Sequence, residues 1–142
     1  MLESQPDTPV LPAGYEFHHL GFATESIESE LRWLKALGYT PDGAEFVDPI
    51  QGIIGRFLIG LGPRIELLQN LSGQRTLSRW LERGVRVYHF AYLVQDVQQA
   101  VSWAHGFGAK VTVPPVPAVA FAMRPICFVV FRNGMMLEFI EK

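Results

Sequence analysis

Residues 17–23, FHHLGFA, and residues 87–94, VYHFAYLV, decide the fold of this chain. When the sequence is laid over itself with an offset of 70 residues, the two stretches coincide, and further positions of the same type fall on one another. The matched pairs of identical residues are His19 and His89, Trp33 and Trp103, and Gly38 and Gly108. An internal repeat of this length indicates that one structural unit is present twice.

Each copy begins with an apolar run typical of a buried strand, and a helix follows. Ser26 and Asp96 are placed as helix N-caps, and Gln99 completes a capping box with Asp96. Apolar residues at helical spacing give each helix one buried stripe: Ile27, Leu31 and Leu34 in the first, and Val97, Val101 and Ala104 in the second. Gly38 and Gly108 are expected to end these helices.

Three short strands are predicted after each helix. In the first copy they are residues 45–47, 53–61 and 64–68, and in the second copy residues 110–113, 126–131 and 135–140. Gly62-Pro63 and Asn133-Gly134 are turn signals before the last strand of each copy. The sequence therefore predicts an α+β fold made of two tandem β-α-β-β-β modules.

A short linker helix is predicted between the modules, over residues 76–83. Leu77, Trp80 and Leu81 recur at helical spacing and form its apolar side. Arg75, Arg79 and Arg83 recur every four residues on the other side. These arginines fit either a solvated helix face or a contact with a phosphate-bearing substrate.

Both copies also place a histidine and a glutamate where a charge is costly. His19 and His89 lie in the first strands, and Glu66 and Glu138 lie in the apolar last strands of the two modules. A charge inside an apolar strand needs a partner or a metal. Two imidazoles and two carboxylates suit one divalent ion such as Zn, Ni, Co, Mn or Fe(II), because the carboxylates balance its charge.

The residues around these histidines refine the prediction. Gly21 on the face of His19 and Ala91 on the face of His89 are small, which is expected to leave room for a group that is not protein. His18 competes with His19, but neighbouring strand residues point to opposite faces, so only one of them is expected to line the site. At the offset of 70 residues His19 aligns with His89, so His19 is the histidine expected to line the site.

Composition favours a small-molecule partner. The chain has 142 residues, 18% charged residues and a net charge of −2, so it has no strong field for nucleic acid or an anionic membrane. Cys127 sits in an apolar run and is expected to be a buried structural thiol. Without an apolar stretch long enough to cross a membrane or a signal-like N-terminus, the chain is expected to be cytoplasmic.

These stretches resemble the vicinal-oxygen-chelate superfamily, which includes glyoxalase I and bleomycin-resistance proteins. The resemblance covers residues 16–141. Within it, Gln51-Gly52, the run from Gly62 to Leu68 and the linker leading into Tyr88-His89 are similar to methylmalonyl-CoA epimerase. The resemblance implies metal ligands at His19, Glu66, His89 and Glu138, and a curved mixed sheet around one metal or ligand pocket.

The expected organisation is a flexible N-terminal arm at 1–14 and one domain at 15–142, formed by module one (15–70), the linker helix (71–84) and module two (85–142). Analogy with the superfamily implies a homodimer. The loop at 114–125 differs from the epimerases and is expected to form much of the pocket rim. Candidate substrate-binding residues are Gln51, Phe57, Ala91, Phe121 and Arg124.

The leading functional hypothesis is a metal-dependent isomerase or epimerase that abstracts a proton next to a carbonyl, possibly in methylmalonyl-CoA or a similar acyl thioester. Glu138 is the expected base, with Glu45 and Asp48 as weaker candidates. One alternative is a small-molecule binding or drug-sequestering protein without catalysis. The other is a glyoxalase I-like lyase, whereas the second carboxylate counts against a dioxygenase.

Overall fold

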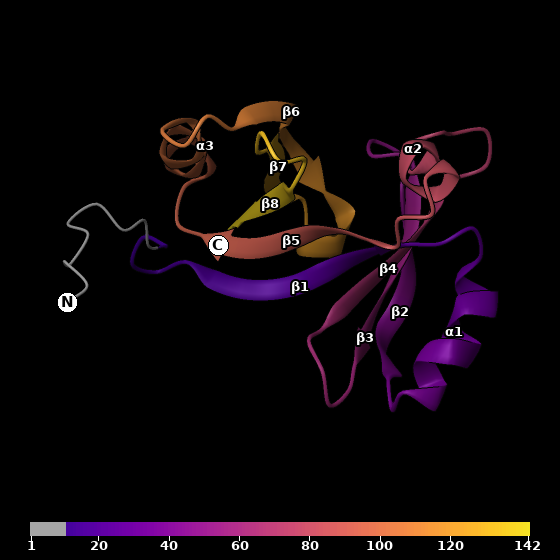
Figure 1. Cartoon of the computed structure of the whole chain (residues 1–142). Helices are drawn as coiled ribbons and strands as arrows, with labels where there is room; N and C mark the ends of the chain where they lie inside the picture. Colours follow the sequence, from indigo (N-terminus) through magenta and orange to yellow (C-terminus); the bar gives the residue numbers. More distant parts are fainter. Residues whose placement is uncertain (1–10) are drawn as a thin grey trace, which may run out of the picture.

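The computed structural model describes residues 11–142, which form one mixed, curved eight-stranded sheet with strand order β2-β3-β4-β1-β5-β8-β7-β6 (Figure 1). The first module comprises β1 (Glu16–Ala23), α1 (Ile27–Ala36), β2 (Thr40–Asp48), β3 (Ile53–Ile59) and β4 (Ile65–Asn70). After α2 (Ser78–Glu82), the second module comprises β5 (Val87–Val94), α3 (Val97–His105), β6 (Lys110–Ala118), the 3-10 turn η1 (Val119–Phe121), β7 (Arg124–Val130) and β8 (Met136–Glu141). The predicted duplication of a β-α-β-β-β unit is confirmed.

The two modules meet at the first strand of each. β1 and β5 pair antiparallel in the middle of the sheet. On the outer side of this pair, β1 runs parallel to β4, and β5 runs parallel to β8. The first and last strands of each module therefore occupy the four central positions, and β2 and β6 lie at the two edges.

The predicted N-caps of α1 and α3 are confirmed. Ser26 accepts a hydrogen bond from the Ser29 N–H at the start of α1, and Asp96 accepts from Gln98 and Gln99 at the start of α3. Gly38 adopts a left-handed conformation just after α1, with φ of +89°. The linker helix places Leu77 in the core, with Trp80 and Leu81 packed against the same cluster.

Each helix covers the apolar face of its own module. The α1 side chains Ile27 and Leu34 pack with Leu58 and Leu67 of the sheet. The α3 side chains pack with a second cluster that contains Cys127, which is fully buried as predicted. A separate core therefore lies under each of the two helices.

Two edge strands are longer than the sequence indicated. β2 begins at Thr40 rather than at residue 45, with an irregular ladder around Gly43, whose φ is +85°. β6 continues through Pro114, Pro115 and Pro117 to Ala118, so the expected rim loop at 114–125 is partly strand. An edge strand tolerates proline because its outward N–H groups have no partner strand.

Of the expected N-terminal arm, residues 1–10 lie outside the described part of the chain, and residues 11–14 form neither helix nor strand. The main-chain oxygen of Gly14 accepts a hydrogen bond from the Lys142 ammonium at 2.8 Å, which ties the two ends of the described segment together. Within residues 11–142, none of the helices has the length and apolar character needed to span a bilayer.

Candidate metal centre and adjoining cavity

The four predicted ligands come from the four central strands. On β1, Gly21 is paired with Glu66 of β4 on one side and with His89 of β5 on the other. On β5, Ala91 is likewise flanked by Glu138 of β8 and His19 of β1. The same arrangement therefore occurs once in each module, with the two half-sites facing each other across the central pair.

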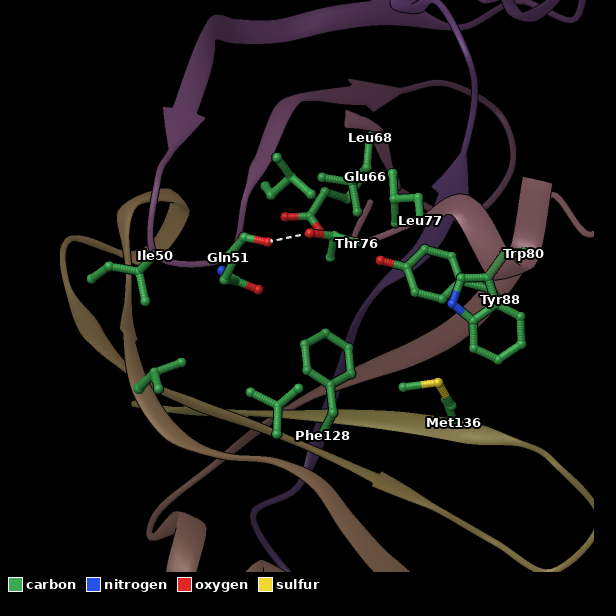
Figure 2. A pocket seen from close by; sticks show the side chains of 13 residues that line it. Ile50, Gln51, Glu66, Leu68, Thr76, Leu77, Trp80, Tyr88, Phe128 and Met136 are labelled. Carbon is green, nitrogen blue, oxygen red and sulfur yellow. Dashed lines mark hydrogen bonds between the residues drawn. The ribbon is translucent and has the colours of Figure 1, made fainter. Parts of the chain in front are cut away.

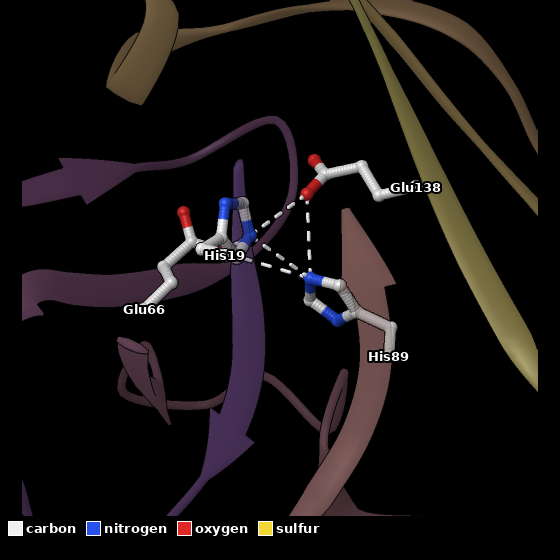
Figure 3. A group of neighbouring side chains, drawn as sticks. All are labelled: His19, Glu66, His89 and Glu138. Atoms are coloured by element: carbon white, nitrogen blue, oxygen red, sulfur yellow. Dashed lines mark hydrogen bonds and ion pairs between the residues drawn. The ribbon is translucent and has the colours of Figure 1, made fainter. Parts of the chain in front are cut away.

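The four side chains converge on one point (Figure 3). The Nε2 atoms of His19 and His89 lie 3.2 Å apart. Glu138 Oε1 lies 3.2 Å from His19 Nε2 and 3.3 Å from His89 Nε2, and Glu66 Oε1 lies 3.2 Å from His19 Nε2. The ligand atoms all lie within 4.8 Å of one another, a spacing compatible with one cation that binds nitrogen and oxygen at about 2.0–2.2 Å.

The electrostatics of this cluster favour positive charge. Burial favours the neutral form of His19, but Glu66 and Glu138 outweigh it and raise the pKa of His19 to about 9. Burial also opposes ionisation of Glu138, yet close contacts with His19 and His89 lower its pKa to about 2. Both carboxylates are almost completely buried, so the site favours a compensating positive charge, which a protonated His19 or a bound cation supplies.

An unsatisfied atom supports a metal as that cation. Glu138 Oε1 is buried and has no hydrogen-bond partner within residues 11–142, although two imidazole nitrogens lie close to it. A divalent ion bound by both imidazoles would also satisfy this oxygen. The donor set, its burial and its spacing therefore fit a divalent metal.

The space next to the small residue Gly21 is not available to a bound molecule, contrary to the prediction. A Cβ added at Gly21 would lie 1.9 Å from Cε1 of the His89 ring. The space at Gly21 is therefore filled by His89, and the expectation that it admits a non-protein group is wrong. Ala91 is fully buried opposite His19. Each histidine therefore lies opposite a small residue of the other module.

The placement of His18 also differs from the prediction. Phe17 pairs with Tyr92 and His19 pairs with Ala91, so two steps along β1 match one step along β5. His18 is the extra residue of a β-bulge, which breaks the usual alternation of strand side chains. His18 and His19 therefore lie on the same side of the sheet.

His18 connects the cluster to Arg64. Its Nδ1 lies 2.8 Å from His19 Nδ1, and its Nε2 accepts a hydrogen bond from Arg64 Nη1 at 2.8 Å. Burial and the neighbouring His19 lower the pKa of His18 to about 4. The rings of Phe57 and Phe121 pack against both histidines. This side of the cluster is closed by protein.

The other side of the cluster adjoins a cavity of about 240 Å³ (Figure 2). Its wall is mainly apolar and includes Ile53, Leu68, Leu77, Val113, Phe128 and Met136. Its polar residues are Gln51, Glu66, Thr76 and Tyr88. Glu66 therefore links the cluster to the cavity.

The amide of Gln51 is held in one orientation. Its Nε2 donates to Asp48 Oδ2 at 2.9 Å, and because a carboxylate only accepts, this contact identifies the amide nitrogen. The Gln51 side-chain oxygen is turned toward the cavity (Figure 2). Its main-chain oxygen accepts from Thr76 Oγ1 at 2.8 Å. Gln51 therefore presents a fixed hydrogen-bond acceptor to a bound molecule.

The two weaker candidates for a base lie elsewhere. Asp48 is fully buried, and its Oδ1 accepts from the N–H groups of Ile50 and Gln51. Its Oδ2 also accepts from the N–H of Val119 at 3.1 Å, which joins the end of β2 to η1 in the other module. Glu45 is exposed on the edge strand β2. Neither residue lines the cavity described above.

Of the five predicted substrate contacts, Gln51 lines the cavity. Phe57 and Phe121 pack together beside His19, with ring centroids 5.9 Å apart. Ala91 is buried in the sheet, and Arg124 is exposed and donates from Nε to the Phe121 main-chain oxygen. The structure therefore places these four residues around the closed side of the cluster or away from it.

Sequence analysis missed Tyr88 as a cavity residue. The β1–β5 ladder is irregular a second time, since Gly21 pairs with His89 and Phe22 pairs with Val87. Tyr88 is the extra residue of this bulge, so it lies on the cavity side next to His89. The internal repeat contained a signal for this residue, because Tyr88 aligns with His18 when the sequence is laid over itself with an offset of 70 residues.

Comparisons with known proteins agree with this architecture. A model of the glyoxalase/bleomycin resistance protein/dioxygenase superfamily matches residues 18–128. A hypothetical protein from Bacillus halodurans C-125 is 25% identical, with a TM-score of 0.76 over 91% of this chain and 95% of that one. Methylmalonyl-CoA epimerase from Mycobacterium tuberculosis is 20% identical, with a TM-score of 0.72 over 88% and 86% of the two chains.

A variant of Streptomyces coelicolor methylmalonyl-CoA epimerase, in complex with 2-nitronate-propionyl-CoA, is 18% identical, with a TM-score of 0.71 over 89% of this chain and 94% of that one. At these identities, the likeness to the epimerases concerns the fold. Comparison with curated proteins gave no match.

Proposed function

Because the chain belongs to the glyoxalase/bleomycin resistance protein/dioxygenase superfamily, we propose that it is a divalent-metal-dependent isomerase or epimerase that moves a proton next to a carbonyl group. One observation carries this proposal. A buried cluster of two histidines and two glutamates adjoins a mainly apolar cavity, and Glu66 belongs to both. A substrate oxygen could therefore reach the cluster while its carbon skeleton occupies the cavity.

His19, Glu66, His89 and Glu138 would hold the metal, which supplies a Lewis acid for the substrate oxygens when bound. Proton transfer then needs a carboxylate near the acidic carbon. Glu138 is the expected base, and its Oε1 has no hydrogen-bond partner within residues 11–142. Glu66 is the second candidate because it faces the cavity.

The proposed substrate is a small carbonyl compound with an acidic C–H, such as an acyl thioester. The apolar wall favours a short alkyl group, and Gln51 offers its amide oxygen to a substrate N–H or O–H. Structural neighbours named as methylmalonyl-CoA epimerases support methylmalonyl-CoA as the first compound to test.

The first measurement is metal content by plasma mass spectrometry, for the purified protein and for a Glu66→Ala, Glu138→Ala double variant. We expect about one divalent ion per chain, lost in the double variant. The second measurement is exchange of deuterium from D2O into methylmalonyl-CoA. Protein that neither contains metal nor takes it up would rule out the proposal.

Glu138→Gln and Glu66→Gln then identify the base. We expect the Glu138 variant to lose exchange because a carboxamide cannot accept the proton, and the Glu66 variant to retain part of it. Metal content is measured in both, so that loss of the ion is separated from loss of the base. Loss of exchange in the Glu66 variant alone, with its metal retained, would transfer the role to Glu66.

A second candidate function is binding of a planar apolar molecule without turnover. The observation that favours it is the aromatic part of the cavity wall, where Trp80 and Tyr88 stack with ring centroids 5.5 Å apart. Tight metal-independent binding, without turnover of acyl thioesters, would support this function. A glyoxalase-like lyase would use the same donor set, and turnover of a hemithioacetal of glutathione would reveal it.

We also propose that the chain forms a homodimer. The two central strands leave large apolar side chains open to solvent: Phe17 is 47%, Val87 is 45% and Phe90 is 38% exposed. Apolar side chains grouped on central strands are typical of surfaces that bind another protein. Light scattering coupled to size-exclusion chromatography measures the molar mass directly, and a monomer at micromolar concentration would contradict this proposal.

A further inference from the structure

Tyr88 is a cavity residue whose position depends on a backbone irregularity. The bulge in β5 turns it to the same side as His89, the ligand that follows it in sequence. Its hydroxyl is turned into the cavity, on the side where Glu66 lies (Figure 2). The residue is therefore close to the place where a substrate oxygen would meet the cluster.

The Tyr88 ring is held on two sides. Trp80 of α2 stacks on one face at 5.5 Å with an interplanar angle of 29°, and the His89 ring meets it edge-on at 4.5 Å and 85°. Contacts of this kind restrict the two side-chain torsions of tyrosine. The hydroxyl is thus a pre-oriented group, and binding a substrate costs little conformational entropy there.

A phenolic hydroxyl is protonated near neutral pH and can donate one hydrogen bond. Among the cavity-lining residues, Glu66 offers an acceptor as a carboxylate, and Gln51 turns its amide oxygen inward. These groups suit the positive or hydrogen-bond-donating parts of a ligand. A substrate oxygen that gains negative charge needs a donor instead, and Tyr88 supplies one.

We propose that the Tyr88 hydroxyl is a catalytic hydrogen-bond donor, which binds the substrate oxygen on which negative charge develops as the neighbouring C–H loses its proton. This inference rests on the proposed function and deepens it. Tyr88 keeps its own proton in this step, and the carboxylate base takes up the proton that leaves the carbon.

The test compares Tyr88→Phe with the matched control Tyr92→Phe. Tyr92 lies on the same strand and packs against the α3 core and Phe17, away from the cavity. Each metal-loaded variant is assayed for metal content, for melting temperature, for deuterium exchange into methylmalonyl-CoA, and for calorimetric affinity for 2-nitronate-propionyl-CoA, an anionic mimic of the deprotonated substrate.

We expect Tyr88→Phe to keep its metal and to bind the nitronate about tenfold to a hundredfold more weakly, because a hydrogen bond to a charged oxygen is lost. Exchange should fall mainly through kcat, while Tyr92→Phe stays within about twofold of the wild type. Wild-type-like affinity and exchange in a metal-loaded Tyr88→Phe protein would overturn this inference and leave the proposed function intact. A wild-type protein without metal or exchange would instead overturn the proposed function.

Discussion

The two sides of the cluster of His19, Glu66, His89 and Glu138 differ, although the residues that precede its two histidines occupy equivalent positions of the repeat. His18 and Tyr88 are the extra residues of equivalent bulges in β1 and β5. His18 is fixed by Arg64 and flanked by Phe57 and Phe121, so the side of the cluster next to His18 is closed. Tyr88 faces a cavity of about 240 Å³ that residues of both modules line, so the side of the cluster next to Tyr88 is open. The duplicated histidines and glutamates form a symmetric centre, and the cavity lies on the side of Tyr88.

Removing one ligand from either module tests the symmetric part of this comparison and should give the largest effect. We expect His19→Ala and His89→Ala each to lower metal affinity by more than about a hundredfold, because each removes one of only four donors. Equilibrium dialysis with Zn measures the loss. His105→Ala, an exposed residue at the end of α3, is the control. A variant that keeps wild-type affinity would show that the substituted histidine is not a donor.

Asp48→Ala tests the contact between the modules outside the cluster. We expect it to lower the free energy of unfolding by on the order of 3 kcal/mol, because three main-chain N–H groups lose their acceptor. Chemical denaturation measures the change. Glu45→Ala, on the exposed part of the same strand, should change it by less than about 0.5 kcal/mol. Equal effects of the two substitutions would mean that the Asp48 contacts contribute little.

Gly21→Ala tests the close approach of the modules at β1. The added Cβ would overlap the His89 ring, so we expect a loss of about 1–3 kcal/mol in stability from overpacking and weaker metal binding from displacement of His89. Denaturation and dialysis measure the two effects. Ala91→Gly removes a Cβ at the equivalent position and should leave metal affinity almost unchanged. Unaltered metal affinity in Gly21→Ala would show that His89 can move without cost.

His18→Phe tests the closed side alone. We expect a loss of about tenfold in metal affinity, because His19 loses the partner of its second ring nitrogen. The substrate affinity of the metal-saturated protein should change little, since the cavity lies on the other side of the cluster. Dialysis and calorimetry separate the two quantities. A change confined to substrate affinity would show that the closed side opens to ligands.

The smallest effect is expected at Cys127. Burial is the main cause that raises the pKa of its thiol to about 12, so the reactive thiolate stays scarce up to strongly alkaline pH. We expect iodoacetamide at pH 8 to alkylate Cys127 only in the unfolded protein. Mass spectrometry of the folded and the unfolded protein measures the modification. Rapid modification of the folded protein would contradict the buried position of this residue in the second core.

The repeat was sufficient to predict the two modules and the convergence of His19, Glu66, His89 and Glu138, because both depend on patterns that the sequence displays directly. The two bulges could not be predicted in the same way. A bulge depends on how one strand is aligned with its partner, and neither β1 nor β5 contains a residue that requires it. The assignment of His18 to the opposite face failed for this reason.

Other features depend on contacts between distant segments. Asp48 looked like a free carboxylate in the sequence, but the structure joins it to the main chain of Val119 in the other module. Because Gly21 has no side chain, we expected room for a ligand next to it, but the His89 ring occupies that space. The second half of the edge strand β6 was not predicted because of its prolines, since their meaning depends on whether the strand lies at an edge or in the centre of the sheet.

The antiparallel pairing of β1 and β5 at the centre of the sheet has a consequence for biosynthesis. While the ribosome is still making the residues between β1 and β5, the β1 segment has been synthesised but β5 has not. The edge of β1 that pairs with β5 therefore lacks the partner for its N–H and C=O groups. A nascent edge of this kind can pair with the same strand of another polypeptide. The interval before Val87–Val94 emerges is thus when aggregation or strand exchange between chains is most favoured, and slower translation across α2 would lengthen it.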